Sequence, residues 1–398
     1  MDERARMTSE KLQFGRINPL LPSGVICVCL AAGVLVAIWS DVLATGSLSW
    51  TNTDFSNYWI ASRLVLEGQA IDLFSGQDTY FRHMQAAFGP DYDWHNWSYP
   101  PSFLLMIWPL GLMPHAVSMV VFLLLTVILF LHSISVVEQG AHAIVPILLS
   151  MFLICNGYLA QNGFLTAALL LYGLGLRERF PLLAGVAFGL LTVKPQLGLL
   201  IPLLLLYERR WPVILSASVT ALLLIALSTL LFGFDSWRGY LEHNIPYQGR
   251  VMAELSGVFL YMMPSTFGYV RSLGSEAGMA MMVHMPVAGL ALVAFIWGLT
   301  QVKNQWERSL ILLLATFLIS PYALIYDMGA LAAVAAVTFA RTESVNGADT
   351  VWTFLLSATA LLSVLHPFLA FSFSLPVAPV VLWLCLLMLL IRRGVSEH

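Results

Sequence analysis

The chain has 398 residues and a formal net charge of −3; 59% of its residues are hydrophobic and only 10% are charged. Because an average soluble domain carries about 25% charged residues, this composition excludes an ordinary soluble protein and predicts a polytopic membrane protein. The sequence contains no basic patch and no nucleic-acid recognition motif, so we expect no nucleic-acid partner. The four cysteines lie within apolar runs and lack metal-ligand spacing, which favours small buried side chains over a disulfide framework.

Hydrophobic runs fill most of the chain and predict an all-α protein, a single integral membrane domain over residues 1–398 with about 12 spans. A run that crosses lipid unaided needs about 20 apolar residues, so we expect the shorter runs to lie inside the bundle. The first run leads into Trp39, Ser40 and Asp41, which favours an uncleaved span over a signal peptide. The predicted spans are residues 22–40, 114–137, 141–156, 163–176, 181–193, 195–207, 212–233, 277–300, 309–321, 324–340, 350–371 and 375–391.

The basic residues assign these spans to two sides. The positive-inside rule places both termini and three short loops in the cytoplasm, namely RER (177–179), ERRW (208–211) and KNQWER (303–308). Prolines bracket and break the apolar piece 102–113, so we expect a re-entrant or surface-lying helix there. With this parity, residues 41–101 form a first periplasmic loop and residues 234–273 a second.

The first periplasmic loop is acidic and much longer than an ordinary connection, so it should have structure and a role of its own. The segment DFSNYWIASRLVLEG has apolar residues near helical spacing and predicts an amphipathic helix on the membrane surface. Asp54 stands at its start, where an N-cap is favoured, so capping alone could explain this acid. A second surface helix is expected at DTYFRHMQAAF, and DWHNWSYPP is typical of an aromatic belt at the interface.

Lys194 stands in GLLTVKPQLGLLIP, a run that is otherwise without charge. A cation buried in the bilayer costs about 2.5–3.5 kcal/mol on insertion scales, so such a lysine is a functional candidate by default. The alternative is a lysine at a helix end that snorkels to the headgroups. The Lys194-Pro195-Gln196 segment forms the tip of a hairpin between two cytoplasmic loops, and we therefore expect it to point outward.

Three more polar breaks fall on the same predicted side, although each could serve only structure. NGYLAQNG carries Asn156, Gln161 and Asn162, whose amides could cap helix ends. The stretch 234–257 carries His243 and Arg250, and SPYALIYD carries Tyr322, Tyr326 and Asp327. Their convergence with Lys194 and the acidic loop favours an active site at the outer interface over a transport path at the midplane.

The chemistry of this predicted site is suggested by what the sequence lacks. No soluble nucleotide-binding motif is present, so an activated donor should arrive through the membrane. A lipid-phosphate donor fits, because a cation can bind its phosphate and a carboxylate can act as general base for an incoming hydroxyl. The histidines and acids show no recognisable metal-ligand spacing, and we expect neither a metal nor a cofactor.

Five segments together resemble glycosyltransferase family 87, the polyprenyl-phosphate-sugar-dependent membrane transferases that include mycobacterial α-1,2-mannosyltransferases. The resemblance extends over about residues 50–340 in the same order, and the segments are DFSNYWIASRLVLEGQAIDLF, SYPPSFLLMIWPLGLMP, AQNGFLTAALL, LLAGVAFGLLTVKPQLGLLIPLLLLYERRW and SPYALIYDMGAL. It implies a GT-C-type fold in the bacterial inner membrane. It also implies transfer of a sugar, mannose being one candidate, from a polyprenyl-phosphate donor to a lipid or glycan acceptor hydroxyl, on the periplasmic side and with inversion.

The resemblance also assigns roles to residues. Asp54 matches the early-loop aspartate of the family and is expected to be the catalytic base, while Lys194 matches the lysine of the KPQ motif and is expected to bind the donor phosphate. We add Arg63, Arg250 and Arg271 as further phosphate-binding candidates. The expected substrate-binding residues are Tyr58, Gln161, Asn162, Gln196, His243, Tyr322, Tyr326 and Asp327.

Two other functions stay open at the level of sequence. A lipid-linked sugar flippase or other transporter would need a polar path across both leaflets. A non-catalytic scaffold in a cell-envelope complex would use Lys194 and Asp327 only for structure, as partners of each other. In every case membrane lipids surround the chain.

Overall fold

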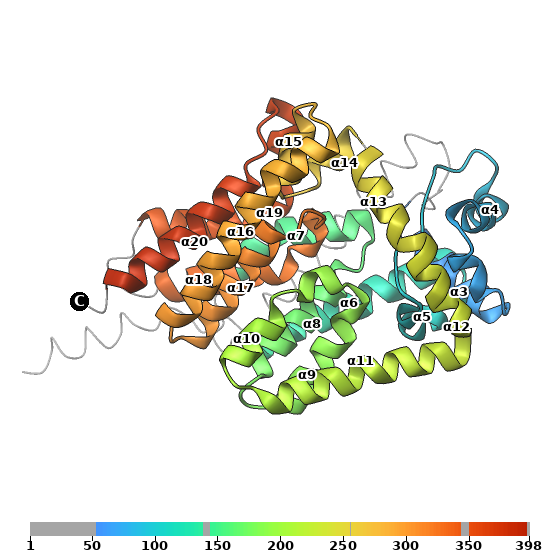
Figure 1. Cartoon of the computed structure of the whole chain (residues 1–398), viewed down its shortest axis with the longest axis horizontal. Helices are drawn as coiled ribbons and strands as arrows, with labels where there is room; N and C mark the ends of the chain where they lie inside the picture. Colours follow the sequence, from blue (N-terminus) through green and yellow to red (C-terminus); the bar gives the residue numbers. More distant parts are fainter. Residues whose placement is uncertain (1–52, 138–143, 255, 344–349, 396–398) are drawn as a thin grey trace, which may run out of the picture.

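A computed structural model describes residues 53–137, 144–254, 256–343 and 350–395. Its regular structure in these ranges is entirely helical, which confirms the predicted all-α class (Figure 1). The predicted first span, residues 22–40, and the start of the first periplasmic loop lie outside the described residues, as do Cys27 and Cys29.

The described part of the predicted first periplasmic loop folds into α3 (Phe55–Leu66), η1 (Ala70–Phe74) and α4 (Gln77–Phe88). The apolar piece after it forms a broken helix, α5 (Pro101–Ile107) and η2 (Trp108–Leu112). The helical course of residues 102–113 changes to a 3-10 turn at Trp108, next to Pro109, as the flanking prolines predict.

Helix α3 is more buried than the surface helix that the sequence predicts. Its Ser62 hydroxyl donates to the Ile107 carbonyl at 2.7 Å, and the Trp59 indole donates to the Met113 carbonyl at 2.9 Å. Gly111 allows this approach, because a Cβ atom there would lie 2.8 Å from the Ser62 carbonyl carbon. Small residues on both sides therefore dock α3 onto α5 and η2, which fixes the position of Asp54 at its start.

The rest of the chain is a bundle whose helices follow the predicted runs closely. The next elements are α6 (His115–Val137), α7 (Ile144–Leu159), α8 (Gly163–Leu176), α9 (Pro181–Leu190), η3 (Leu191–Val193), η4 (Pro195–Gly198), α10 (Ile201–Tyr207) and α11 (Trp211–Phe232). The C-terminal part has α16 (Ala277–Gln301), α17 (Gln305–Ile319), η6 (Ile325–Asp327), α18 (Gly329–Glu343), α19 (Thr350–Phe373) and α20 (Ala378–Val395).

Four helices, α6, α11, α16 and α19, are long and apolar enough to cross a membrane by length and composition. The other apolar helices are shorter, since polar breaks such as Lys194-Pro195 divide the runs. Several of the shorter ones lie at the centre: residues 309–318 of α17 are all buried, and α18 is rich in alanine, which allows close packing with its neighbours. The number of 12 spans and the GT-C type therefore stay predictions.

The predicted second periplasmic loop, residues 234–273, is mostly helical. It contains α12 (Phe234–Gly239), a π-helical turn η5 (Tyr240–Asn244), α13 (Ile245–Glu254), α14 (Val258–Tyr261) and α15 (Thr266–Ser272). The buried Asn244 amide donates to the Leu73 carbonyl at 3.1 Å and to the Trp97 carbonyl at 2.9 Å. The two predicted periplasmic segments thus contact each other directly.

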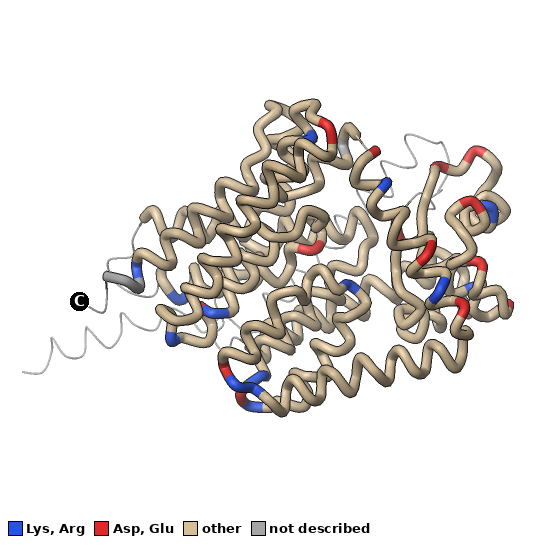
Figure 2. Tube along the Cα trace, in the orientation of Figure 1, with Lys and Arg blue, Asp and Glu red and all other residues tan. Residues whose placement is uncertain are grey.

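Acidic and basic residues gather at different ends of the molecule. Figure 2 shows the acidic residues gathered mainly around α3, α4 and α12–α13, whereas the opposite end of the bundle is mainly basic. The helices between these two ends are almost free of charge. This separation agrees with the sides that the basic loops predict, although the direction of the protein in a membrane stays a prediction.

Candidate active site

One cavity of about 540 Å³ collects the polar breaks of the sequence. Its lining comes from the start of α3, the segment 94–99, the turn before α8, the Lys194 break, the helical segments η5, α13 and α14, and the segment 320–326. Stretches that are far apart in the chain therefore meet at one place. Asp54 and Lys194, the predicted base and the predicted phosphate-binding cation, both line this cavity.

Asp54 occupies the N-cap position of α3, but its side chain makes no capping hydrogen bond among the described residues. Its carboxylate is partly buried and faces the cavity instead. Burial raises the pKa of Asp54 above 3.8, while a hydrogen bond from Gln161 and the charges of His95 and Lys194 oppose that rise. A carboxylate of raised pKa at a cavity wall is suited to accept a proton.

Lys194 is 6% exposed and lies where the chain breaks between η3 and η4. Pro195 prevents a continuous helix here, and the lysine backbone takes a non-helical conformation that turns the side chain inward. Its ammonium lies 2.5 Å from Asp327 Oδ1 and 3.0 Å from Asn162 Oδ1, and 4.7 Å from the centre of the Tyr326 ring. The cation is therefore held by an acid, an amide and an aromatic face, and does not snorkel along a helix end.

The turn between α7 and α8 is held tightly. Ala160 has φ +49°, a left-handed conformation that costs an ordinary residue roughly 1–2 kcal/mol. The Asn156 side chain spans the turn, donating to the Gln161 carbonyl at 3.2 Å and accepting from the Gly163 amide at 3.1 Å. A Cβ atom at Gly163 would lie 2.0 Å from the Tyr326 carbonyl oxygen, so only glycine fits. This turn fixes Gln161 and Asn162 beside Asp54 and Lys194.

The other predicted substrate-binding residues divide into two groups. Tyr58, Gln161, Gln196, Tyr322 and Tyr326 line the cavity, and Asn162 and Asp327 lie directly behind its wall as partners of Lys194. His243 is exposed on the π-helical turn and is not part of the lining. Its neighbour Asn244 is buried instead, because the turn directs that side chain toward the first loop.

The three arginines expected to bind phosphate have other contacts. Arg63 pairs with Glu67 one helical turn along α3, at 2.7 Å. Arg250 lies over the Tyr247 ring, and Arg271 donates to the Ala253 and Ser275 carbonyls. None of the three belongs to the cavity lining. Among the predicted phosphate-binding residues, Lys194 alone borders the described cavity.

Several cavity residues were missed by the sequence analysis. Tyr99 and His95 come from DWHNWSYPP, whose density of polar and aromatic residues was a usable signal. Gln248 of α13 donates to the Ser98 hydroxyl at 2.5 Å, and its own carbonyl oxygen has no hydrogen-bond partner in the described part of the chain. Gln248 lines the cavity, although this oxygen atom is itself buried. No sequence pattern marks Gln248.

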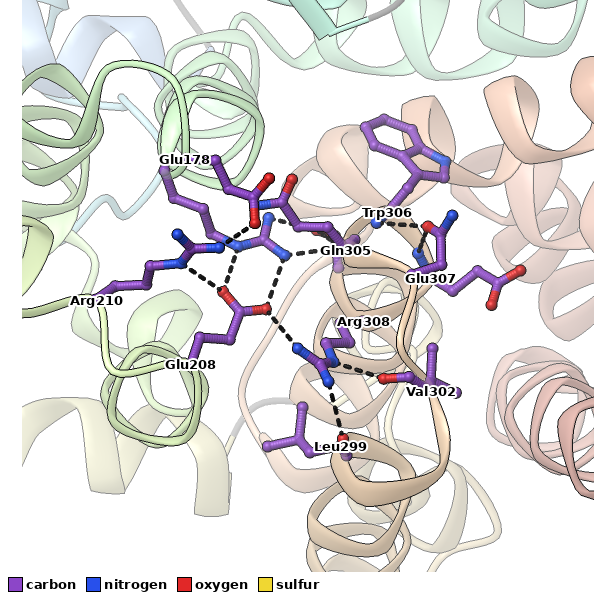
Figure 3. Close-up of polar contacts among 12 residues, drawn as sticks. Glu178, Glu208, Arg210, Leu299, Val302, Gln305, Trp306, Glu307 and Arg308 are labelled. Carbon is purple, nitrogen blue, oxygen red and sulfur yellow. Dashed lines mark hydrogen bonds and ion pairs between the residues drawn. The ribbon is translucent and has the colours of Figure 1, made fainter.

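A second polar cluster lies at the far ends of the helices that carry the cavity residues. Glu208, 2% exposed in its side chain, accepts from Arg177 Nε at 2.9 Å and from Arg308 Nη1 at 3.4 Å, and Arg210 lies 3.6 Å away (Figure 3). Arg177 also donates to the Ser309 hydroxyl and the Gln305 carbonyl. The three basic loops that the sequence places on one side therefore do meet. Burial disfavours the charged form of Glu208, yet these guanidinium groups hold its pKa below the usual range.

Metal binding finds no support in the described residues, where no three His, Cys, Asp or Glu side chains gather as ligands would. The arrangement instead combines an acid, a buried cation and neutral polar groups around one cavity within an apolar helical bundle. These are the features of a site that can bind a polar substrate inside a membrane protein.

The comparison with family models agrees with this class. The chain matches the model of glycosyltransferase family 87 over residues 97–321, more than half of its length, and it belongs to that family. It is therefore a membrane glycosyltransferase. Lys194 and the Gln161 turn lie inside the matched range, whereas Asp54 precedes it and Asp327 follows it. Neither a curated protein nor a solved structure matches the chain.

Proposed function

We propose that the protein transfers a sugar from a polyprenyl-phosphate donor to a hydroxyl of a lipid or glycan acceptor, with its cavity facing the periplasm of the bacterial inner membrane. The observation that carries the proposal is that Asp54 and Lys194, from distant parts of the chain, line the same cavity. An acid that can take a proton and a cation that can bind a phosphate are the two groups that this reaction needs.

In the proposed step, Asp54 takes the proton of the acceptor hydroxyl as its oxygen attacks the anomeric carbon of the sugar. The bond between that carbon and the phosphate oxygen breaks, and the polyprenyl phosphate leaves with the electron pair, next to Lys194. Attack from the side opposite the leaving group inverts the anomeric configuration. Gln248 lines the cavity and would contact the sugar or the acceptor.

A lipid donor is supported by a second cavity of about 420 Å³ among α9, α10 and α11. Its lining is mainly apolar, and it shares Pro195 with the first cavity. Pro195 follows Lys194 directly, so a lipid whose phosphate contacts Lys194 could place its isoprenoid chain in this apolar cavity. A water-soluble sugar nucleotide has no isoprenoid chain that this apolar cavity would bury.

The test uses the purified protein in liposomes with polyprenyl-phosphate mannose or glucose, labelled in the sugar, and a total lipid extract as acceptor. Asp54→Asn should lower transfer by about 10²–10⁴-fold, the usual contribution of a positioned base. Asp72→Asn is the matched control, because Asp72 lies in the same acidic loop but pairs with His83. Transfer retained in Asp54→Asn would remove Asp54 from the chemistry. Transfer by the wild type from a sugar nucleotide alone would overturn the donor class.

One observation favours a purely structural role for the pair of Lys194 and Asp327. Lys194 and Asp327 already neutralise each other, as a purely structural pair would. In that case both single substitutions, Lys194→Met and Asp327→Leu, should lower the unfolding temperature, and the double substitution should restore it without any transfer activity being lost. A wild-type protein that moves labelled lipid across the bilayer without forming a new glycosidic bond would instead favour a transporter.

A further inference from the structure

Residues 94–98 form one rim of the described cavity, and buried side chains hold this rim in place. The segment is not helical, and its residue Trp97 is fully buried. The Gln77 side chain accepts from the Trp97 backbone amide at 2.9 Å and donates to the Trp97 carbonyl at 3.1 Å. Asn244 donates to the same carbonyl at 2.9 Å. Because Gln77 and Asn244 are themselves buried, the rim is formed before any ligand arrives.

Trp94 places an aromatic surface at this rim. Its side chain lines the cavity and is 46% exposed. The Phe81 ring of α4 packs against it, with ring centres 4.5 Å apart, and the indole N–H donates to the Tyr247 hydroxyl of α13 at 2.8 Å. Two separate helices therefore fix the indole ring, and its one polar group already has a partner. A ligand that stacks on the exposed part immobilises no further side chain, which lowers the entropic cost of binding.

Two polar groups with unused hydrogen-bonding capacity stand on the same rim. The Ser98 hydroxyl oxygen accepts from the Asn96 amide at 2.7 Å and from the Gln248 amide at 2.5 Å. A serine hydroxyl also has one proton to donate, and no group in the described part of the chain accepts it. The Asn96 carbonyl oxygen likewise has no donor among the described residues, and it is not one of the buried atoms. One donor and one acceptor are therefore left for a ligand in the cavity.

An aromatic surface beside a hydroxyl donor and a carbonyl acceptor has the chemistry that recognises a sugar ring. One face of a pyranose carries C–H groups that stack on an aromatic ring, and the hydroxyls at its edge both donate and accept hydrogen bonds. We propose that Trp94, Asn96 and Ser98 form an acceptor subsite, in which a sugar ring of a glycan acceptor stacks on Trp94 and hydrogen-bonds to the other two. A lipid acceptor without a sugar would leave all three contacts unused.

The exposure of the cavity residues assigns this ring to the acceptor and not to the donor. Lys194, which is proposed to bind the donor phosphate, is 6% exposed, whereas Trp94 is 46% exposed. The donor has a single sugar next to its phosphate, so that sugar lies at the enclosed side of the cavity. An acceptor glycan continues away from its reacting hydroxyl and needs the open side. The assignment to an acceptor rests on the proposed function, but sugar binding at Trp94 is measurable without any reaction.

The experiment first measures binding in the absence of a donor. The full-length protein is purified in a detergent without a sugar headgroup, because a maltoside would compete for the subsite. Saturation-transfer NMR then follows the binding of neutral trisaccharides of mannose, glucose and galactose at millimolar concentration. At least one should bind the wild type, and Trp94→Ala should weaken its binding about tenfold, as the loss of a stacked aromatic contact predicts. Trp94→Phe should recover part of the affinity, and Ser98→Ala should weaken it about threefold.

The second measurement separates the acceptor from the donor. With the protein in liposomes and the glycolipid fraction of the total lipid extract as acceptor, Trp94→Ala should raise the KM for the acceptor about tenfold and leave the KM for the polyprenyl-phosphate donor unchanged. A donor KM that rises instead would overturn the assignment to the acceptor. If Trp94→Ala does not fold, as judged by thermal unfolding, Trp94→Leu replaces it, since leucine keeps an apolar contact with Phe81 but has no aromatic surface.

Trp237→Ala is the matched control, because Trp237 also donates its indole N–H to a hydroxyl, that of Ser228 at 3.1 Å, but lies outside the cavity lining. Its trisaccharide affinity should equal that of the wild type. Equal affinity in Trp94→Ala, or no trisaccharide binding to the wild type, would overturn the subsite even if Asp54→Asn abolishes transfer. Binding that is lost in Trp94→Ala, in a protein that transfers no sugar from polyprenyl phosphate, would support the subsite and overturn the proposed function.

Discussion

Two buried ion clusters stand at opposite ends of the same helices, and they differ in what surrounds them. Helix α8 lies between its cap residues Asn162 and Arg177. Helix α10 lies between Lys194 and Glu208, and α17 has Arg308 in its first turn and ends next to Ser320. At one end Lys194 and Asp327 border a cavity, and at the other end Glu208 is enclosed by arginines. The same helices therefore have one open polar end and one closed polar end.

The difference teaches how to separate a functional charge from a structural one in a membrane bundle. Burial alone does not distinguish them, since Asp327 and Glu208 are each 2% exposed in their side chains. The distinguishing feature is whether the ions contact a space that a ligand can enter. Glu208 connects three loops through its ion pairs with arginines. Lys194, at a break between two helices, borders a cavity instead.

The largest effect is expected at the closed cluster. Glu208→Ala leaves Arg177 buried without its acid, and breaking a buried ion pair in this way costs about 3–5 kcal/mol of stability. Thermal unfolding in detergent should show a large fall in midpoint, while the transfer rate per folded molecule stays near the wild-type value. Asp54→Asn should show the reverse. If Glu208→Ala lost transfer but kept its unfolding temperature, the contrast between the clusters would be wrong.

The open cluster should respond in substrate use as well as in folding, because Lys194 and Asp327 are also a buried ion pair. Lys194→Ala removes the cation that contacts both Asp327 and Asn162, and we expect the KM for the polyprenyl-phosphate donor to rise by at least about tenfold, since hydrogen bonds to charged groups contribute about 1.5–3 kcal/mol. Lys194→Arg should recover part of the loss, because the charge is kept. A donor KM unchanged in Lys194→Ala would return the pair to a structural role.

The pH dependence of transfer provides a smaller test of the open end. Asp54 must be ionised to accept a proton, and burial raises its pKa above 3.8. The value of kcat/KM for transfer should therefore be highest above this raised pKa and should decrease as the pH falls through it. If another group is the base, this decrease persists in Asp54→Asn. A rate that stays constant as the pH falls to 3.8, the ordinary pKa of an aspartate, would contradict this assignment.

The smallest effect is expected at the surface pair of α3. Arg63 and Glu67 are both exposed, and such pairs contribute about 0.2–1 kcal/mol at most. Arg63→Gln should leave the unfolding temperature close to the wild-type value and change the transfer rate by less than about twofold. A large loss of donor use in this variant would show that Arg63 reaches the phosphate in the bound state, as the sequence analysis first suggested.

The helices were largely predictable because apolar runs and their polar breaks are local signals. The predicted run 163–176 coincides with α8, and the predicted break at Lys194-Pro195-Gln196 separates η3 from η4. The sequence also suggested that Lys194 and Asp327 could be partners, and their distance of 2.5 Å confirms this contact. In these places one strong local constraint, an ion among apolar residues or a proline in a helix, decides the structure.

The composition of the cavity was less predictable, because it depends on contacts between distant loops. Arg250 and Arg271 looked like phosphate ligands by charge, but each finds partners within its own segment. No sequence pattern predicted Gln248 as a cavity residue, since its position depends on the contact of α13 with Ser98. The direction of the Gln161 amide likewise depends on a tyrosine that is more than a hundred residues away. A single sequence carries no record of such pairings.

The shortness of the hairpin that carries Lys194 has a consequence for the surrounding bilayer. Helices α9 and α10 have 10 and 7 residues, which correspond to about 15 Å and 10 Å of helix, against about 30 Å of hydrocarbon in a typical bilayer. Their outward side chains, such as Leu182, Leu183 and Leu203, are exposed and apolar. Hydrophobic mismatch should therefore draw the acyl chains inward beside this hairpin. In this way a headgroup-sized donor phosphate would reach Lys194 through a locally thinned leaflet, and transfer in liposomes should fall as the lipid acyl chains are lengthened.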